Sequence, residues 1–143
     1  MSASEQRLSL LNAYAPTVGT IAMSEEPPHC YEVKSGKDFE SILSLSFDIS
    51  VIVDFWAPFC RPCVNFAPTL DKLGVEYKEK VRIVKVNCTD LESIPSRYAV
   101  KCLPTFILFR EGKEVARREG ANEKNVLELI NHNPWHGISI DVK

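Results

Sequence analysis

Residues 51–63 contain two cysteines separated by two residues, placed where an apolar, β-branched run gives way to a helical pattern. The run includes Val51 and Val53, and a helix that begins near Pro62 places Cys60 at its N-terminus. Unpaired backbone N–H groups and the helix dipole favour negative charge at that position, so they favour the thiolate of Cys60. Cys63 follows one turn later. The spacing therefore predicts an attacking thiol, Cys60, and a second thiol that resolves a mixed disulfide.

A structural zinc site is the main alternative for such a cysteine pair. Structural zinc needs four Cys or His ligands, commonly as two closely spaced pairs. The chain has five cysteines, but Cys60 and Cys63 form the only pair with this spacing, and the three histidines fall in the flanks: His29, His132 and His136. An odd number of cysteines also argues against a fully paired secreted framework. Redox chemistry without a metal is the favoured interpretation.

Five motifs, in order and at the family's spacing, resemble the thioredoxin family. The resemblance covers roughly residues 31–131. It implies an α/β thioredoxin fold, a central mixed β-sheet with helices on both faces, and a protein-disulfide reductase. The motifs are Val53-Asp54-Phe55-Trp56-Ala57, Cys60-x-Pro62-Cys63, Ala67-Pro68, Val84-Lys85-Val86-Asn87 and Cys102-Leu103-Pro104-Thr105-Phe106.

Asp54 ends a strand that should be buried, so burial is expected to raise the pKa of its carboxyl group. A polar residue satisfied at a strand end is the alternative interpretation. The resemblance implies that Asp54 lies beneath the buried cysteine, accepts its proton and interacts with Lys85. It also implies that the Leu103–Pro104 bond is cis, that Pro104 faces the cysteines, and that the backbone of Leu103 pairs with the substrate.

The resemblance also implies a surface that contacts the substrate protein. Two of its residues depart from the family's commonest sequence, which has Trp and Gly where this chain has Phe59 and Arg61. Phe59 retains an aromatic ring without the indole donor, and Arg61 adds a cation between the cysteines; a solvated side chain with little effect is the alternative for Arg61. The expected contact residues are Trp56, Phe59, Arg61, Pro62, Leu103 and Pro104.

Cys102 stands two residues before Pro104. In similar members of the family an extra cysteine at this point lies near the active surface and can bridge two molecules, so Cys102 is a regulatory candidate. The alternative is a small residue that behaves as a hydrophobe, which is the favoured interpretation of Cys30 and Cys88.

The remaining pattern alternates strands and helices, as an α/β domain requires. Asn122 is expected to cap the last helix. Three parts are predicted: a flexible N-terminal extension (1–29), the thioredoxin domain (30–131) and a C-terminal tail (132–143). Strands are expected at 31–33, 50–55, 81–86, 104–109 and 113–118, and helices at 37–45, 62–78, 91–98 and from 122 to about 130.

The net charge of −2 gives no reason to expect binding to nucleic acid or an anionic membrane, and no apolar run approaches the ~20 residues that span a bilayer. The resemblance implies no bound cofactor beyond the redox-active Cys60–Cys63 disulfide. It implies electrons from NADPH through a flavin-containing thioredoxin reductase, and clients such as peroxiredoxins, ribonucleotide reductase and methionine sulfoxide reductases. The expected location is the cytoplasm, with mitochondria as the alternative. The protein is expected to be a monomer that can form an oxidative dimer through Cys102.

Two rival functions remain open at this point. A specialised oxidant or glutathione-linked enzyme is made more plausible by Arg61, but strongly oxidising relatives usually carry His at the position of Pro62. A non-enzymatic binding module with the same fold is the other rival, and the intact pair of Cys60 and Cys63 argues against it.

Overall fold

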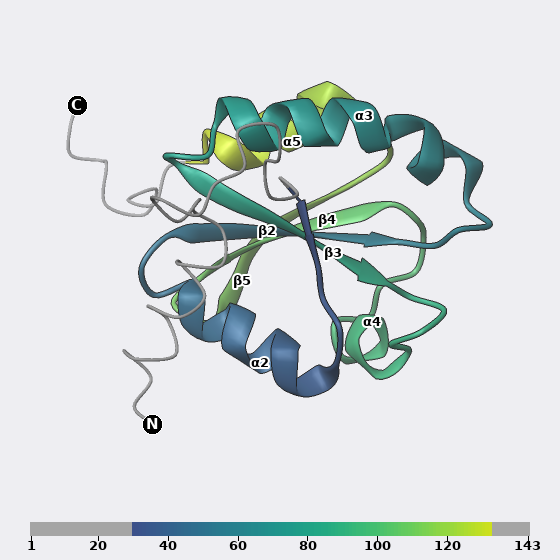
Figure 1. Ribbon diagram of the computed structural model, residues 1–143, viewed down its shortest axis with the longest axis horizontal. Coiled ribbons are helices and arrows are strands. Elements are labelled where there is room, and N and C mark those ends of the chain that lie inside the picture. Colours follow the sequence, from purple (N-terminus) through teal and green to yellow (C-terminus); the bar gives the residue numbers. More distant parts are fainter. Residues whose placement is uncertain (1–29, 133–143) are drawn as a thin grey trace, which may run out of the picture.

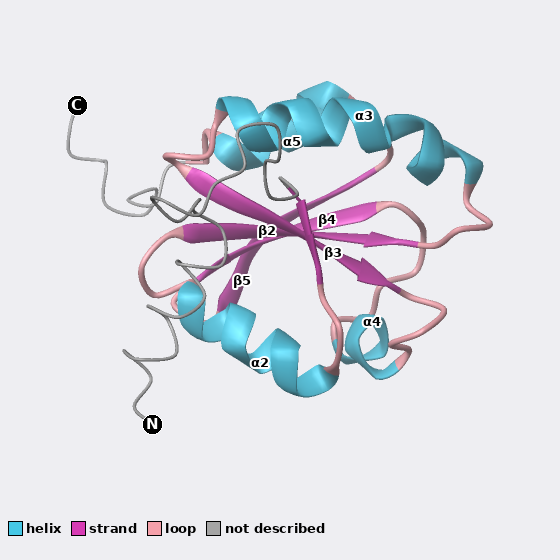
Figure 2. Ribbon diagram, in the orientation of Figure 1, coloured by secondary structure: helices cyan, strands magenta, loops and turns pink. Residues whose placement is uncertain are grey.

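A computed structural model describes residues 30–132, in which five strands form one mixed sheet with helices on both faces (Figure 1). Strands and helices alternate up to β4, and a hairpin and a closing helix follow (Figure 2). This is the predicted α/β architecture. The elements are β1 (Cys30–Glu32), α2 (Gly36–Leu45), β2 (Ser50–Trp56), α3 (Arg61–Glu76), β3 (Val81–Asn87), α4 (Ser93–Arg97), β4 (Thr105–Arg110), β5 (Lys113–Glu119) and α5 (Glu123–Ile130). The predicted extension and tail lie outside the described residues, apart from His132.

The sheet has the strand order β1-β3-β2-β4-β5. The central strand β2 runs parallel to β3 and antiparallel to β4, and β1 adds to β3 in parallel. Residues 51–55 of β2 are all buried. A strand covered on both faces reads as a near-continuous apolar run, which is how this segment was identified from its sequence.

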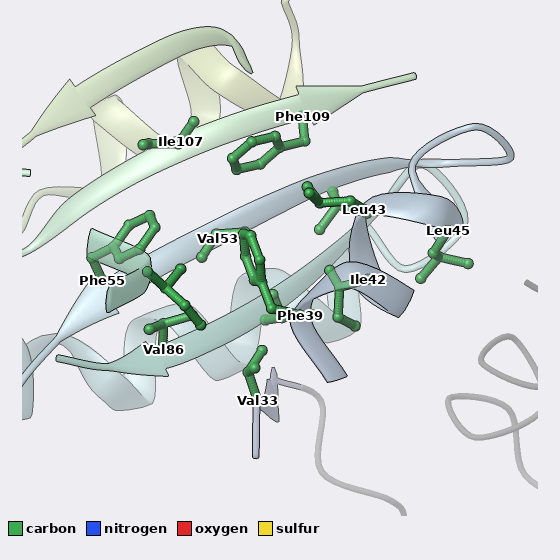
Figure 3. Close-up of a cluster of buried hydrophobic side chains, with 13 residues drawn as sticks. Val33, Phe39, Ile42, Leu43, Leu45, Val53, Phe55, Val86, Ile107 and Phe109 are labelled. Atoms are coloured by element: carbon green, nitrogen blue, oxygen red, sulfur yellow. The ribbon is translucent and has the colours of Figure 1, made fainter. Parts of the chain in front are cut away.

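Side chains alternate between the two faces of the sheet. On one face, Val51, Val53 and Phe55 pack against α2 and α4, with Phe39 of α2 at the centre of the cluster (Figure 3). On the other face, Ile52 packs among the buried side chains of α3 and α5. The alternation places Asp54 on this second face, beneath α3. A buried carboxyl group on the central strand is therefore directed toward the helix that begins beside the cysteine pair.

Side-chain oxygen atoms cap the N-termini of α2 and α5. Ser35 accepts a hydrogen bond from the Asp38 N–H at 3.0 Å at the start of α2. Asn122 accepts one from the Asn125 N–H at 3.0 Å, which confirms the cap predicted for α5. Within the described part of the chain, none of the helices is long and apolar enough to cross a membrane.

Two sequence-based expectations need correction. The predicted helix at 91–98 is shorter at both ends in the structure, Ser93–Arg97, and Ala99, with a positive φ of 53°, prevents its continuation at the C-terminal end. The predicted helix at 62–78 ends earlier, at Glu76, because the backbone of Tyr77 (φ −111°, ψ 23°) has left the helical region, and its apolar residue Val64 is 47% exposed. The helix buries the stripe that contains Leu70 and Leu73, and Val64 lies outside it.

Candidate active site

Cys60 and Cys63 form a disulfide at the N-terminus of α3, with their Cα atoms 5.3 Å apart. Their exposed fractions are only 9% and 7%. They form a small buried cluster with Ala57, and partly buried Trp56 and Leu103 pack against it. The disulfide therefore lies just below the protein surface, with only a small part of each cysteine exposed.

The local sequence shapes this helix start. The Cys60 N–H donates to Ala57 O at 3.0 Å, which closes the turn after β2. Cys60 is the extended N-cap residue of α3, and its Sγ accepts the Cys63 N–H at 3.2 Å. Pro62 occupies the first turn, where a missing N–H costs no helical hydrogen bond. Sulfur thus takes the place that Ser, Thr or Asp usually occupies at a helix N-cap.

Asp54 is 5% exposed, which confirms the predicted burial. Burial raises the pKa of its carboxyl group from 3.8 to about 7, and the charge of Glu32 adds to this effect while that of Lys85 opposes it. Among the described residues, no donor forms a hydrogen bond to Oδ1 of Asp54. A buried carboxyl group with a pKa near neutrality can both accept and release a proton under ordinary conditions.

Lys85 of β3 is the register partner of Asp54 on β2. Its Nζ lies over the ring of Trp56, 4.6 Å from the ring centroid. The Trp56 Nε1–H in turn donates to Glu32 Oε2 at 3.1 Å. The sequence motifs contain Asp54, Lys85 and Trp56 but not Glu32, since nothing in the sequence of β1 indicates which strand it pairs with.

The Leu103–Pro104 peptide bond is cis, which confirms that expectation. Pro104 is buried, and Leu103 packs against the disulfide cluster. Phe59 and Arg61 flank Cys60, and Phe59 is 77% exposed. The structure therefore brings the predicted contact residues to one end of the sheet around the disulfide.

A pocket of about 340 Å³ that the sequence did not reveal lies beside Leu103. It extends from Leu103 toward α4. Its lining is Cys88, Glu92, Pro95, Ser96, Val100, Lys101 and Leu103.

The other described cysteines have free thiols in three different environments. Cys30 is buried against α3, and burial raises the pKa of its thiol. Cys88 is half-buried, and burial raises the pKa of its thiol to about 11. Both groups are therefore thiols rather than thiolates at neutral pH, as their predicted structural role requires. Cys102 is exposed.

Comparisons with known proteins agree on one family. The family model described as Thioredoxin matches residues 31–132. A thioredoxin of Haemophilus influenzae is 43% identical over 90 residues, which cover 63% of this chain and 83% of that protein. A thioredoxin of Rickettsia bellii is 36% identical over 98 residues, covering 68% of this chain and 92% of the relative. The crystal structure of Fasciola hepatica thioredoxin superposes with a TM-score of 0.66 at 35% identity, over 70% of this chain and 95% of that one.

Proposed function

Since this chain belongs to the thioredoxin family and is a thiol–disulfide oxidoreductase, we propose that it reduces protein disulfides with Cys60 as the attacking thiol and Cys63 as the resolving thiol. The observation that carries this assignment is the hydrogen bond from the Cys63 N–H to Cys60 Sγ, 3.2 Å long, at the start of a 16-residue helix. A backbone donor and the positive end of the helix dipole both stabilise negative charge on that sulfur.

The reaction consists of two exchanges at sulfur. In the reduced enzyme the Cys60 thiolate attacks one sulfur of the client disulfide; the client S–S bond breaks, a mixed disulfide forms, and the other client sulfur leaves as a thiolate that takes up a proton. The Cys63 thiolate then attacks Cys60 Sγ. The mixed disulfide breaks, the Cys60–Cys63 disulfide forms, and the client leaves as a dithiol with two more electrons and two more protons.

Asp54 supplies the proton acceptor for the second exchange. Only a thiolate attacks a disulfide, so the Cys63 thiol must lose its proton before it can resolve the intermediate. A carboxylate whose pKa is about 7 is matched to that task near neutral pH. Lys85 is its charge partner from the adjacent strand, and the positive charge favours the ionised form of Asp54.

The residues around the disulfide form the client-binding surface. Exposed Phe59 offers an apolar contact, and the Leu103 backbone next to Pro104 is the group proposed to pair with an extended client segment. The pocket toward α4 shares Leu103 with this surface and extends it. The proposed contact set is Trp56, Phe59, Arg61, Pro62, Leu103 and Pro104.

Electrons are proposed to come from NADPH through a flavin-containing thioredoxin reductase, with peroxiredoxins and similar disulfide-bearing proteins as clients. The experiment is reduction of insulin disulfides by the full chain, with thioredoxin reductase and NADPH or with glutathione as the donor. Fast turnover with the reductase and little with glutathione is expected. The reverse preference would favour the glutathione-linked alternative, and no turnover with either donor would favour a binding module.

The proposed setting is the cytoplasm, where the protein works as a monomer in electron transport and redox homeostasis. Three free cysteines beside one disulfide fit a reducing compartment. The proposed working domain is residues 30–131. Imaging or fractionation of the full chain distinguishes the cytoplasm from mitochondria, the alternative location.

Replacing Arg61 with Gly is expected to raise the pKa of the Cys60 thiol in the reduced enzyme and to make the reduction potential more negative. The cation lies one residue from Cys60 and stabilises its thiolate, but its exposure screens the attraction. We expect about threefold slower alkylation of Cys60 by iodoacetamide at pH 6. Arg61→Lys keeps the charge and is the control. Equal rates in Arg61→Gly and the unmodified protein would show that Arg61 has no electrostatic effect on Cys60.

Mild oxidation is expected to produce a reducible dimer through Cys102. This thiol is exposed, whereas Cys30 is buried and Cys88 is half-buried. Cys102→Ser should abolish the dimer on non-reducing gels, and the control Cys88→Ser should not. A dimer that persists in Cys102→Ser would assign the bridge to another cysteine.

A further inference from the structure

Glu32 is the last residue of β1, at the edge of the sheet beside the proposed proton acceptor. It is the register partner of Lys85 on β3, and Lys85 is the register partner of Asp54 on β2. Register partners in parallel strands point to the same face of the sheet. The three residues therefore form a row across β1, β3 and β2 on the face that α3 covers, with the single ammonium group between two carboxyl groups.

Trp56 follows Asp54 on β2 and contacts both Lys85 and Glu32. It lies two residues after Asp54 on the same face of β2, its ring lies under the Lys85 ammonium, and its Nε1–H donates to Glu32 Oε2 at 3.1 Å. The same Trp56 packs against the buried cluster that contains the disulfide. One carboxylate thus contacts a side chain of the redox centre directly and shares a cation with the buried acid.

We propose that Glu32 is a positioning residue for disulfide reduction: its carboxylate holds the Trp56 indole in place beside the disulfide and competes with Asp54 for the charge of Lys85. The proposal deepens the proposed function, because it rests on Asp54 as the proton acceptor. It adds a second carboxylate, on a different strand, that changes the pH range over which Asp54 is ionised.

The charges around the two carboxyl groups support this competition. Lys85 lowers the pKa of Asp54, whereas Glu32 raises it. For Glu32 itself, burial raises the pKa and Asp90 adds to this, while the Trp56 hydrogen bond, Lys85 and Lys34 lower it. Removing the charge of Glu32 therefore removes a repulsion that raises the pKa of Asp54, while the attraction of Lys85 that lowers this pKa remains.

Two variants separate the charge of Glu32 from its hydrogen bond. Glu32→Gln keeps an oxygen that can accept the Trp56 N–H but carries no charge, and Glu32→Ala removes both. Glu79→Gln, an exposed residue just before β3, removes the same charge away from the site and is the matched control. All variants are made in the full chain, with Trp135→Phe so that Trp56 is the only tryptophan.

The first readout is the pH profile of kcat/KM for insulin reduction. Activity falls as Asp54 becomes protonated, so a lower pKa of Asp54 moves the acidic limb to lower pH. Both Glu32 variants should move it by about 0.3 to 0.6 pH unit, the effect expected of one partly screened charge about 10 Å away. The shift should shrink at high salt, and Glu79→Gln should not shift the limb.

Two further readouts do not depend on turnover. Carbon NMR titration of the Asp54 carboxyl group should show the same downward change in pKa in both Glu32 variants. The fluorescence of Trp56 should change in Glu32→Ala and stay close to the unmodified protein in Glu32→Gln. A titration of Asp54 and a Trp56 emission that are unchanged in Glu32→Ala would overturn the proposal for Glu32.

The Asp54→Asn variant distinguishes the failure of this proposal from failure of the proposed function. If the acidic limb persists in Asp54→Asn, Asp54 is not the kinetic proton acceptor, and the proposed function is wrong on that point. The NMR titration and the fluorescence then still decide whether Glu32 acts on Asp54 and Trp56. If the limb disappears in Asp54→Asn but stays in place in both Glu32 variants, Glu32 has no role in the reaction.

Discussion

Replacing Cys60 with Ser is expected to reduce insulin reduction to the uncatalysed rate. A serine hydroxyl does not attack a disulfide under these conditions, and the sulfur that accepts the Cys63 N–H is the one lost. The fold should remain, because Ser is itself a preferred N-cap residue and can accept the same hydrogen bond. Circular dichroism of the variant checks the fold, and the NADPH-coupled assay measures the activity.

Cys63→Ser should behave differently, since Cys60 can still attack but nothing resolves the intermediate. We expect mixed disulfides with client proteins that survive denaturing gels without a reducing agent and disappear with one. Cys102→Ser, at an exposed free cysteine, is the matched control and should neither lose activity nor trap clients. Trapping by Cys60→Ser instead of Cys63→Ser would exchange the two roles.

Asp54→Asn is expected to slow insulin reduction by about ten- to a hundredfold near pH 7, the lower range for removal of a positioned proton acceptor. In the unmodified protein, activity should fall as pH drops through about 7, because Asp54 becomes protonated there. Asp54→Asn has no carboxyl group at this position, so its activity should not show this fall with decreasing pH. Glu79→Gln, at an exposed site before β3, controls for the loss of a carboxylate. Equal turnover of Asp54→Asn and the unmodified protein from pH 6 to 9 would remove Asp54 from the mechanism.

The same substitution should stabilise the protein above neutral pH. The folded state raises the pKa of Asp54 from 3.8 to about 7, so it binds this proton more tightly than the unfolded chain does. This group therefore lowers the free energy of unfolding as pH rises from about 4 to 7, by at most about 4 kcal/mol, and leaves it constant above that range. Asp54→Asn should recover about 2 to 4 kcal/mol at pH 8 and little at pH 4.

Urea unfolding of the oxidised protein at several pH values measures this effect, and the control Glu79→Gln, at an exposed site before β3, should follow the unmodified protein throughout. A gain in Asp54→Asn that is the same at pH 4 and pH 8 would mean that it does not arise from the ionisation of Asp54.

Much of the fold could be predicted because the signals are local. The apolar run at 51–55 identified the central strand, and Asn122 identified the start of α5. The cysteine spacing and Pro62 identified the helix start that carries the disulfide. Each of these features depends on residues within one or two turns of one another, which is the range over which sequence patterns are informative.

The features that escaped prediction depend on which strands lie side by side. Glu32 is 24 residues from Trp56 in sequence, and their hydrogen bond exists only because β1 pairs with β3. The pocket beside Leu103 likewise needs α4 and the loop before β4 to meet. The exposure of Val64 could not be predicted, because helical spacing identifies the apolar residues but not which stripe of the helix faces the sheet.

The sulfur cap of α3 has a consequence for electron transfer. In the disulfide form the Cys63 N–H already donates to Cys60 Sγ, and this sulfur retains lone pairs that can accept the same donor when it becomes a thiolate. The donor is a backbone group of the same helix and is already in place when negative charge arrives. The donor that stabilises the Cys60 thiolate therefore does not have to be recruited from elsewhere when the disulfide is reduced.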